Sequence, residues 1–191
     1  MSVLVFVEIA DGEVRGSSLE AVGYGAEVAK TMGVEASALV LGNTVGADQL
    51  AKIGNHGISK VLNVSDERLN NGVIQAYASV LNQVVEQQNA TLIVLAKSSL
   101  GDAVSARVAA RLKAGLASNV IELPDLSGGF KVKRSVYTGK AFQYTTMTSD
   151  KKILALKKGA YALNPTEDVA EVVDTSVTID DADFGVPRLI K

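Results

Sequence analysis

The residues of this sequence best placed to hold a charged ligand are Ser98, Ser99 and Gly101, which separate a predicted strand from a predicted helix. Backbone N–H groups and the helix dipole favour an anion at a helix N-terminus. Ligands of open parallel sheets also bind where strands end. Asp102, however, takes the N-cap or a first-turn position, where its carboxylate would satisfy the same N–H groups and repel a phosphate. The local pattern therefore favours a structural corner over a phosphate site.

Two arginines, Arg107 and Arg111, lie one turn apart on the same predicted helix. Such a pair usually belongs to a solvated face, but in a chain with only 21% charged residues it could also form an interface or an anion clamp. We therefore treat Ser98, Ser99, Gly101, Arg107 and Arg111 as a candidate vestigial ligand loop or interface. The Gly-x-Gly-x-x-Gly and Gly-x-x-x-x-Gly-Lys-[Ser/Thr] phosphate motifs are both missing.

Groups able to support catalysis are sparse. His56 is the only histidine and lies between glycines in a predicted loop, where a histidine is usually solvated. The serine pairs at 17–18 and 98–99 have no Gly-x-Ser-x-Gly elbow, and a triad would have to use His56. The paired acids at 180–181 fit a solvated segment, and no run has zinc or EF-hand spacing. We expect a non-catalytic domain without a metal site.

Composition narrows the remaining classes. The 191 residues are 47% hydrophobic, which suffices for one full core. A net charge of −2 indicates no basic face and argues against a nucleic-acid binder. The absence of cysteine excludes disulfides, thiol catalysis and cysteine-held clusters. The longest apolar runs, 3–7 and 92–96, are too short for membrane insertion, and only two residues precede the first strand, so we expect no targeting peptide and a cytoplasmic protein.

Apolar runs and helical periods alternate along the first two thirds of the chain. Strands are predicted at 3–8, 35–42, 59–64, 90–96 and 118–123, and helices at 17–32, 46–54, 72–89 and 102–112. Ser17 and Glu20 form a capping box for the first helix, in which Gly23 and Gly25 indicate close packing against a neighbour. This order predicts an α/β fold, a Rossmann-like three-layer sandwich with a mainly parallel sheet.

The pattern changes after residue 123. Segments 130–137, 143–148 and 153–156 show no helical period and are separated by turn residues, which predicts antiparallel strands at the edge of the sheet. From residue 164 the chain is acidic and poor in large apolar residues. We expect an α/β domain at 1–163 and an acidic linker or arm at 164–191 that packs against something outside this chain.

Several segments occur together as in one known family: "SVLVFVE", "ALVLG", "ISKVLNV", "SSLGDAVSARVAARLKAGLASNV", "RSVYTGKA" and "KKILALKKGAY". In this order and spacing they resemble the N-terminal domain of the alpha subunit of electron transfer flavoproteins. In that family a Gly-x-Asp-x-x-Pro-Arg-x-Ala-x-x-Leu segment is typical. Gly101, Asp102, Arg107, Ala109 or Ala110, and Leu112 fit it, but Ser105 and Ala106 replace the usual proline before the arginine.

The resemblance implies a scaffold and assembly domain of an electron carrier. The FAD-binding C-terminal domain of such subunits is absent from this chain, so no FAD is expected in it and no flavin-binding residue can be assigned. The intact protein would be a heterodimer with a beta subunit, which in some cases holds AMP. It would take electrons from flavoprotein dehydrogenases, such as the acyl-CoA dehydrogenases of fatty acid beta-oxidation, and pass them to a quinone oxidoreductase.

One alternative of another class stays open, a free-standing adenine-nucleotide-binding module of the universal-stress-protein type. Such modules share this architecture and usually carry Gly-x-x-Gly, nine residues and Gly-[Ser/Thr] after the fourth strand. The segment "AKSSLGDAVSARVAARL" does not have that spacing. An α/β enzyme acting alone is disfavoured by the missing nucleophile, base and metal ligands.

Overall fold

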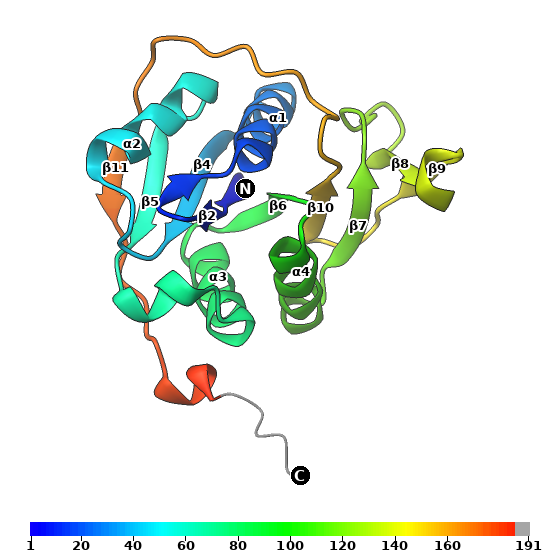
Figure 1. The fold of residues 1–191 in the computed structure, drawn as a ribbon. Helices are drawn as coiled ribbons and strands as arrows, with labels where there is room; N and C mark the ends of the chain where they lie inside the picture. Colours follow the sequence, from blue (N-terminus) through cyan, green and yellow to red (C-terminus); the bar gives the residue numbers. More distant parts are fainter. Residues whose placement is uncertain (186–191) are drawn as a thin grey trace.

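A single nine-stranded sheet runs through the computed structural model, which describes residues 1–185 (Figure 1). The strand order is β11-β5-β4-β1-β6-β10-β7-β8-β9. The parallel strands are β1 (Ser2–Val7), β4 (Glu35–Leu41), β5 (Lys60–Val64), β6 (Ala90–Ala96), β7 (Gly115–Val120), β10 (Lys152–Leu156) and β11 (Glu171–Asp174). The strands β8 (Lys131–Val136) and β9 (Ala141–Thr146) run antiparallel to their neighbours. A separate small hairpin is formed by β2 (Ile9–Ala10) and β3 (Glu13–Val14).

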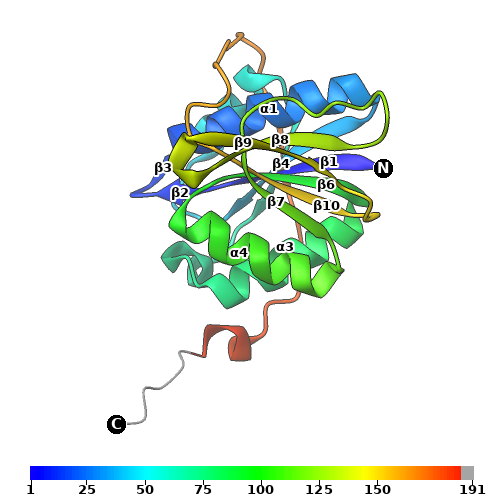
Figure 2. The same ribbon diagram turned by 90° about the vertical axis from the view of Figure 1, so that its right-hand side faces the viewer.

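Helices cover both faces of the sheet. One face carries α1 (Gly16–Met32), α2 (Ala47–Ala51) and the 3₁₀ helix η1 (Lys52–His56), and the other carries α3 (Ile74–Gln87) and α4 (Ser99–Leu112) (Figure 2). Shorter 3₁₀ turns are η2 (Glu67–Asn71), η3 (Tyr137–Gly139) and η4 (Asp181–Phe184). The predicted Rossmann-like three-layer sandwich with added antiparallel strands is confirmed.

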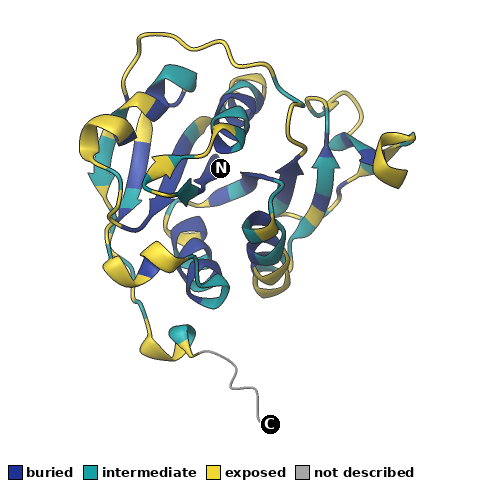
Figure 3. Ribbon diagram, viewed as in Figure 1, coloured by how far each residue is buried: buried dark blue, intermediate teal, exposed yellow. Residues whose placement is uncertain are grey.

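The central strands are apolar on both sides because both sides are covered. In β1 the side chains of Val3, Val5 and Val7 pack toward α1, and those of Leu4 and Phe6 pack toward α3. All five are almost completely buried (Figure 3). This two-sided burial explains why the strand shows no alternation of polar and apolar residues.

The glycines of α1 allow that helix to lie close to its neighbours. A Cβ atom at Gly23 would lie 2.9 Å from the ring of Tyr161, and one at Gly25 would overlap Cγ2 of Val5. The predicted close packing at both positions is confirmed. Gly33 follows the helix in the left-handed conformation, with φ 66°, which is typical of a helix C-terminus.

The predicted capping box of α1 is wrong. The helix begins at Gly16 after Arg15, and no side chain caps it. The Oγ atom of Ser18 instead accepts a hydrogen bond of 3.0 Å from the N–H of Glu8. The carboxylate of Glu20 accepts one of 2.6 Å from the N–H of Gly159, a contact between residues 139 positions apart. The Glu20 carboxylate, which the predicted box would have placed at the helix N-terminus, thus has a tertiary partner instead.

The third segment predicted at the antiparallel edge lies in the middle of the sheet. β8 and β9 are antiparallel additions, as expected, but β10 inserts between β6 and β7 and is parallel to both. Its residues Ile153, Leu154, Ala155 and Leu156 are buried on both faces. Placing this run at the edge was therefore wrong, since only a strand with neighbours on both sides can bury four consecutive apolar residues.

The acidic C-terminal segment packs on the domain itself. We call residues 157–170 the strap and residues 171–184 the arm. The strap crosses the helical face that carries α1 and η1, and the arm adds β11 beside β5 before it follows α3 (Figure 1). Val172, Val173 and Phe184 pack against the two cores, so the expectation that the arm packs against something outside this chain is wrong for these residues. Residues 186–191 of the predicted linker lie outside the described residues, and the domain boundary at 163 remains a prediction.

Candidate functional site

The sheet has one topological switch point, between β1 and β6. The chain leaves β1 toward α1 on one face and leaves β6 toward α4 on the other, and we call the position at the carboxyl ends of these two strands the crevice. Open α/β sheets bind ligands in such crevices. Glu8 follows β1 and Ser98 follows β6, and their side chains meet there.

The centre of the crevice is held by a carboxylate of the protein. Ser98 is the N-cap of α4, and its Oγ accepts a hydrogen bond of 2.8 Å from the N–H of Gly101. The same hydroxyl donates a hydrogen bond of 2.6 Å to Oε2 of Glu8, while Oε1 of Glu8 lies 3.1 Å from Nε of Arg15. Glu8 is only 7% exposed. A buried negative charge thus faces the helix end through the serine.

The same charge affects a neighbouring phenol. Burial first, and the charge of Glu8 second, raise the pKa of Tyr77 to about 12. The hydroxyl of Tyr77 donates a hydrogen bond of 2.6 Å to the carbonyl of Leu69. Tyr77 is therefore a neutral donor at ordinary pH and serves to hold η2 against α3.

Asp102 lies in the first turn of α4, one of the two positions predicted for it, but it does not cap the helix. Its carboxylate forms an ion pair of 2.8 Å with Nζ of Lys97 at the end of β6. Both side chains are partly exposed, so this pair adds little stability. The acidic group that opposes an anion in the crevice is Glu8, held by Ser98, and the prediction had assigned that role to Asp102.

The other predicted site residues are not brought together. Ser99 is exposed in the first turn of α4. Gly101 is buried and lies so close to β6 that a Cβ atom there would overlap the carbonyl oxygen of Ala96. Arg107 and Arg111 lie farther along α4 on its exposed side, where Nη1 of Arg107 donates a hydrogen bond of 3.1 Å to Gln75. An anion clamp that combines these arginines with the helix N-terminus is not formed, because they lie two or more turns away from it.

Sequence reasoning missed Glu8, Arg15 and Lys97. A signal was available for Glu8, since an acidic residue directly after a buried parallel strand lies at the ligand-binding edge of the sheet. No comparable signal existed for Arg15, which reaches Glu8 across the β2–β3 hairpin. With these groups in place, the Ser98 hydroxyl and the N–H of Gly101, two groups that a phosphate would use, already have partners within the protein.

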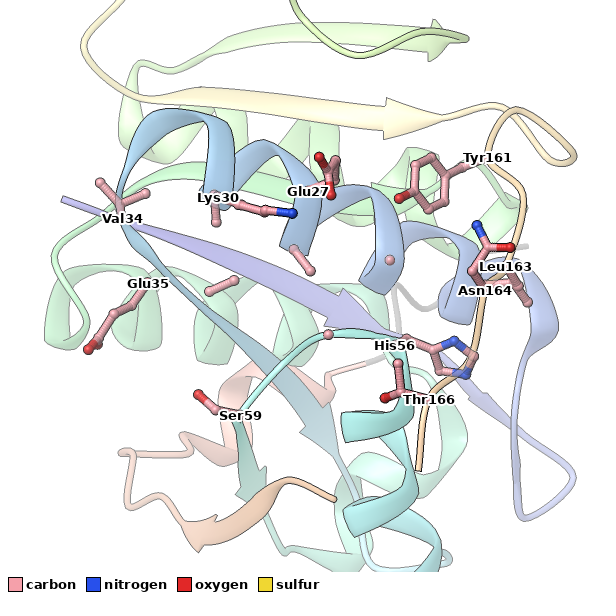
Figure 4. A pocket seen from close by; sticks show the side chains of 15 residues that line it. Glu27, Lys30, Val34, Glu35, His56, Ser59, Tyr161, Leu163, Asn164 and Thr166 are labelled. Atoms are coloured by element: carbon pink, nitrogen blue, oxygen red, sulfur yellow. The ribbon is translucent and has the colours of Figure 1, made fainter. Parts of the chain in front are cut away.

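A cavity of about 560 Å³ lies elsewhere, between α1, the start of β4 and the strap. Figure 4 shows Tyr161, Asn164, Thr166 and His56 near one end of it and Glu35 near the other. His56 ends η1 and is half-buried, so the expected solvated loop position is wrong. Burial lowers its pKa, and its Nδ1 atom is buried without a partner among the described residues. The neutral imidazole is a minor polar element of a mixed, open cavity.

The formal charge is unevenly distributed. Residues 97–158, which contain α4 and β7 to β10, include twelve lysines and arginines but only four aspartates and glutamates. Residues 159–185 include seven aspartates and glutamates and no lysine or arginine. A net charge of −2 therefore conceals a long basic segment, residues 97–158, followed by an acidic one.

Two classes of site are absent from residues 1–185. No group of three or more histidine, aspartate or glutamate side chains in that range is arranged to hold a metal ion. Within the same range no helix combines the length and the apolar character needed to cross a bilayer.

Comparison with known proteins gives a consistent result. The model of the electron transfer flavoprotein domain matches residues 3–181. The electron transfer flavoprotein subunit alpha of Bacillus subtilis is 30% identical over 91% of this chain and 50% of its own length. That of Clostridium acetobutylicum is 34% identical over 63% of the chain and 36% of its own length. A subunit of the NAD⁺- and ferredoxin-dependent lactate dehydrogenase of Acetobacterium woodii, LctC, is 29% identical over 61% and 28%. The chain thus spans half or less of the length of these relatives.

Proposed function

The chain belongs to the electron transfer flavoprotein family, and we propose that it is the N-terminal scaffold and assembly domain of an alpha-type subunit. With a beta-type subunit and FAD, that subunit carries electrons between other redox proteins. The domain itself performs no chemistry. Its role is to hold the two subunits together so that the flavin is positioned and shielded.

The observation that best supports a scaffold is the Glu8–Ser98 contact in the crevice. A nucleotide-binding domain of this architecture would need the helix N-terminus of α4 and the space before it for phosphate. Here both face a buried carboxylate that Arg15 also contacts. The same contact argues against an adenine-nucleotide-binding module of the universal-stress-protein type.

The cofactor of the whole protein is proposed to be FAD, held mainly by parts of the subunit that this chain does not include. When bound, FAD supplies the one-electron steps, and the protein supplies position and electrostatic environment. AMP is proposed for the partner beta-type subunit. The candidate loop of Ser98, Ser99 and Gly101 is proposed to be a vestige of a nucleotide site, and Arg107 and Arg111 to belong to an interface.

The redox partners are proposed from the family. Donors would be flavoprotein dehydrogenases, such as acyl-CoA dehydrogenases in fatty acid beta-oxidation, and the acceptor a quinone oxidoreductase, with the carrier in the cytoplasm. Two relatives are named as parts of different enzymes, one a subunit of a lactate dehydrogenase and the other an electron transfer subunit of acryloyl-CoA reductase. Their names indicate that the redox partners of such proteins vary.

Assembly is the first test. The purified chain is mixed with its cognate beta-type subunit and the mass of the product is measured by light scattering after gel filtration. We expect a one-to-one complex. If the two proteins elute separately at micromolar concentrations, the scaffold role is wrong.

Cofactor retention is the second test. The chain alone is incubated with FAD, dialysed and examined by visible absorption, and we expect no retained flavin band. Calorimetric titration with AMP and ATP should also give no tight binding. A dissociation constant below about 10 μM, equivalent to roughly −7 kcal/mol, would favour the nucleotide-binding module instead.

A further inference from the structure

We propose that the free edge of β9 accepts a β-strand from an acidic surface of the beta-type partner subunit. The inference rests on the proposed function and adds to it the place, the mode and the chemistry of the contact. It comes from a comparison of the two edges of the sheet. Strand addition of this kind uses main-chain hydrogen bonds for affinity and side chains for specificity.

The two edges of the sheet differ in how they are protected. At one edge β11 is only four residues long and carries Glu171 and Asp174 at its ends, a common protection against unwanted pairing. At the other edge β9, with the sequence AFQYTT, has six residues and neither a charge nor a proline. Among the described residues β9 pairs only with β8, so its second row of N–H and C=O groups has no strand partner.

Two side chains of β9 are aromatic and exposed to solvent. Phe142 is 59% exposed and Tyr144 is 64% exposed, and the two lie on the same face of the strand because they are two positions apart. Nζ of Lys133, opposite Tyr144 on β8, lies 4.9 Å from the ring centre of Phe142 and 5.9 Å from that of Tyr144. The lysine orders both rings into one surface. Aromatic residues of this kind often dominate interface energies.

The tip of the hairpin projects a third aromatic ring. Tyr137 is 80% exposed, and its backbone is left-handed with φ 49°, as are Thr138 with φ 55° and Gly139 with φ 94°. Successive left-handed residues are common in hairpin turns, and here they turn the chain between β8 and β9. Figure 3 shows the exposed tip at the end of the sheet beyond α4. The hairpin is thus shaped to reach outward.

The charge of the hairpin determines the chemistry of the partner. Residues 121–149 include four lysines and arginines and two acids, and the acids pair with two of the lysines, Asp125 with Lys131 and Glu122 with Lys133. Two copies paired through β9 would bring two surfaces of net positive charge together, which disfavours a symmetric homodimer. An acidic strand paired with β9 would lie against this positively charged hairpin, which favours association and specificity.

The decisive experiment is amide hydrogen exchange of the chain with and without the cognate beta-type subunit, at about 50 mM and 300 mM salt. We expect peptides that cover β9 to become protected in the complex, with weaker affinity at the higher salt. If the complex forms but β9 exchanges as in the free chain, this inference is wrong and the proposed function stands. If no complex forms, the proposed function itself fails.

Matched variants test the side chains. The double variant Phe142→Ala and Tyr144→Ala should weaken binding of the beta-type subunit by about tenfold or more, whereas Leu163→Ala with Val169→Ala, two other exposed apolar residues, should change it less than about twofold. Unchanged exchange in β1 and β6 checks that the variants fold. Equal effects of both pairs would overturn the assignment.

Other occupants give distinct results. If the chain alone forms concentration-dependent assemblies in which β9 is protected, the occupant is a second copy. If a single-stranded RNA oligonucleotide protects β9, the basic and aromatic surface binds nucleic acid. Either result overturns the assignment to a partner subunit.

Discussion

At the residue scale, Glu8 decides what the crevice can accept. Its carboxylate lies at the strand end where related architectures receive phosphate, and Ser98 and Arg15 hold it there. Ser98 serves two purposes at once, because it caps α4 and donates to Glu8. Glu8 and Ser98 are 90 positions apart in the sequence, and their contact holds a carboxylate at the position where a phosphate would bind.

Removal of the Ser98 hydroxyl should be costly. We expect Ser98→Ala to lower the free energy of unfolding by about 2 kcal/mol, because the helix loses its cap and a buried carboxylate loses a hydrogen bond. Ser99→Ala, one residue later and exposed, should change it by less than about 0.5 kcal/mol. Urea unfolding measures both values, and equal stability of the two variants would contradict this account of the crevice.

His56 should make stability depend on pH. Burial lowers its pKa in the folded state, so the unfolded chain binds a proton near pH 6.5 before the folded chain does. Stability from this group is therefore present above about pH 6.5 and is lost as pH falls toward the lowered pKa. We expect the wild type to lose more stability than His56→Asn between about pH 7 and pH 5.5. Parallel urea midpoints for the two proteins would show that burial has no such effect.

At the element scale, the C-terminal strap and arm behave differently. The exposed strap residues 162–169 form few hydrogen bonds with the rest of the domain. The arm is anchored by β11, by the side chain of Gln83, which bonds both the carbonyl and the N–H of Thr178, and by Arg68, which contacts Asp181 and the ring of Phe184. The acidic arm is thus held by the pairing of β11 with β5 and by the side chains of Gln83 and Arg68.

This difference predicts where a protease cuts first. We expect limited digestion with a glutamate-specific protease to cleave after Glu167 in the strap well before it cleaves after Glu171 in β11, because a paired strand must open before cleavage. Mass spectrometry of early time points identifies the products. The control is the digestion pattern in urea, where the two sites should be cut at similar rates. Faster cleavage after Glu171 in buffer would show that the arm is not docked.

At the scale of the whole molecule, charge is separated along the sheet. The basic residues of 97–158 lie toward the β9 edge and the acidic arm lies at the β11 edge, on opposite sides in Figure 1. Such a separation orients an approaching partner and speeds association at low salt. An overall pI of about 5.5 gives no indication of it.

Ion-exchange chromatography can reveal the separation. We expect the chain to be retarded on a sulfonated resin at pH 7 and low salt although its net charge is negative. Changing Lys131, Lys133 and Lys140 to glutamate should abolish the retardation. The same change at Lys30, Lys52 and Lys60, which alters the net charge equally, should leave most of it. If both triple variants elute alike, net charge rather than the hairpin governs binding.

Local sequence was enough to predict the alternation of strands and helices, the mainly parallel sheet and two of the three expected antiparallel additions. These features follow from hydrophobic period and turn chemistry, which are properties of neighbouring residues. The glycines of α1 were also correctly interpreted, because two glycines inside a helix need a packing reason. The motifs of residues 98–120 and 134–141 were enough to indicate the family.

Contacts between distant segments depended on the tertiary structure. It placed β10 in the middle of the sheet, paired β11 with β5 and gave Ser18 and Glu20 partners other than a helix cap. It also brought Glu8 to Ser98. Ser98 caps α4, and the carboxylate of Asp102 pairs with Lys97 instead of capping the helix. The physical reason is the same in each case. A buried polar group takes the best partner in space, and a local pattern cannot show which distant residue will be there.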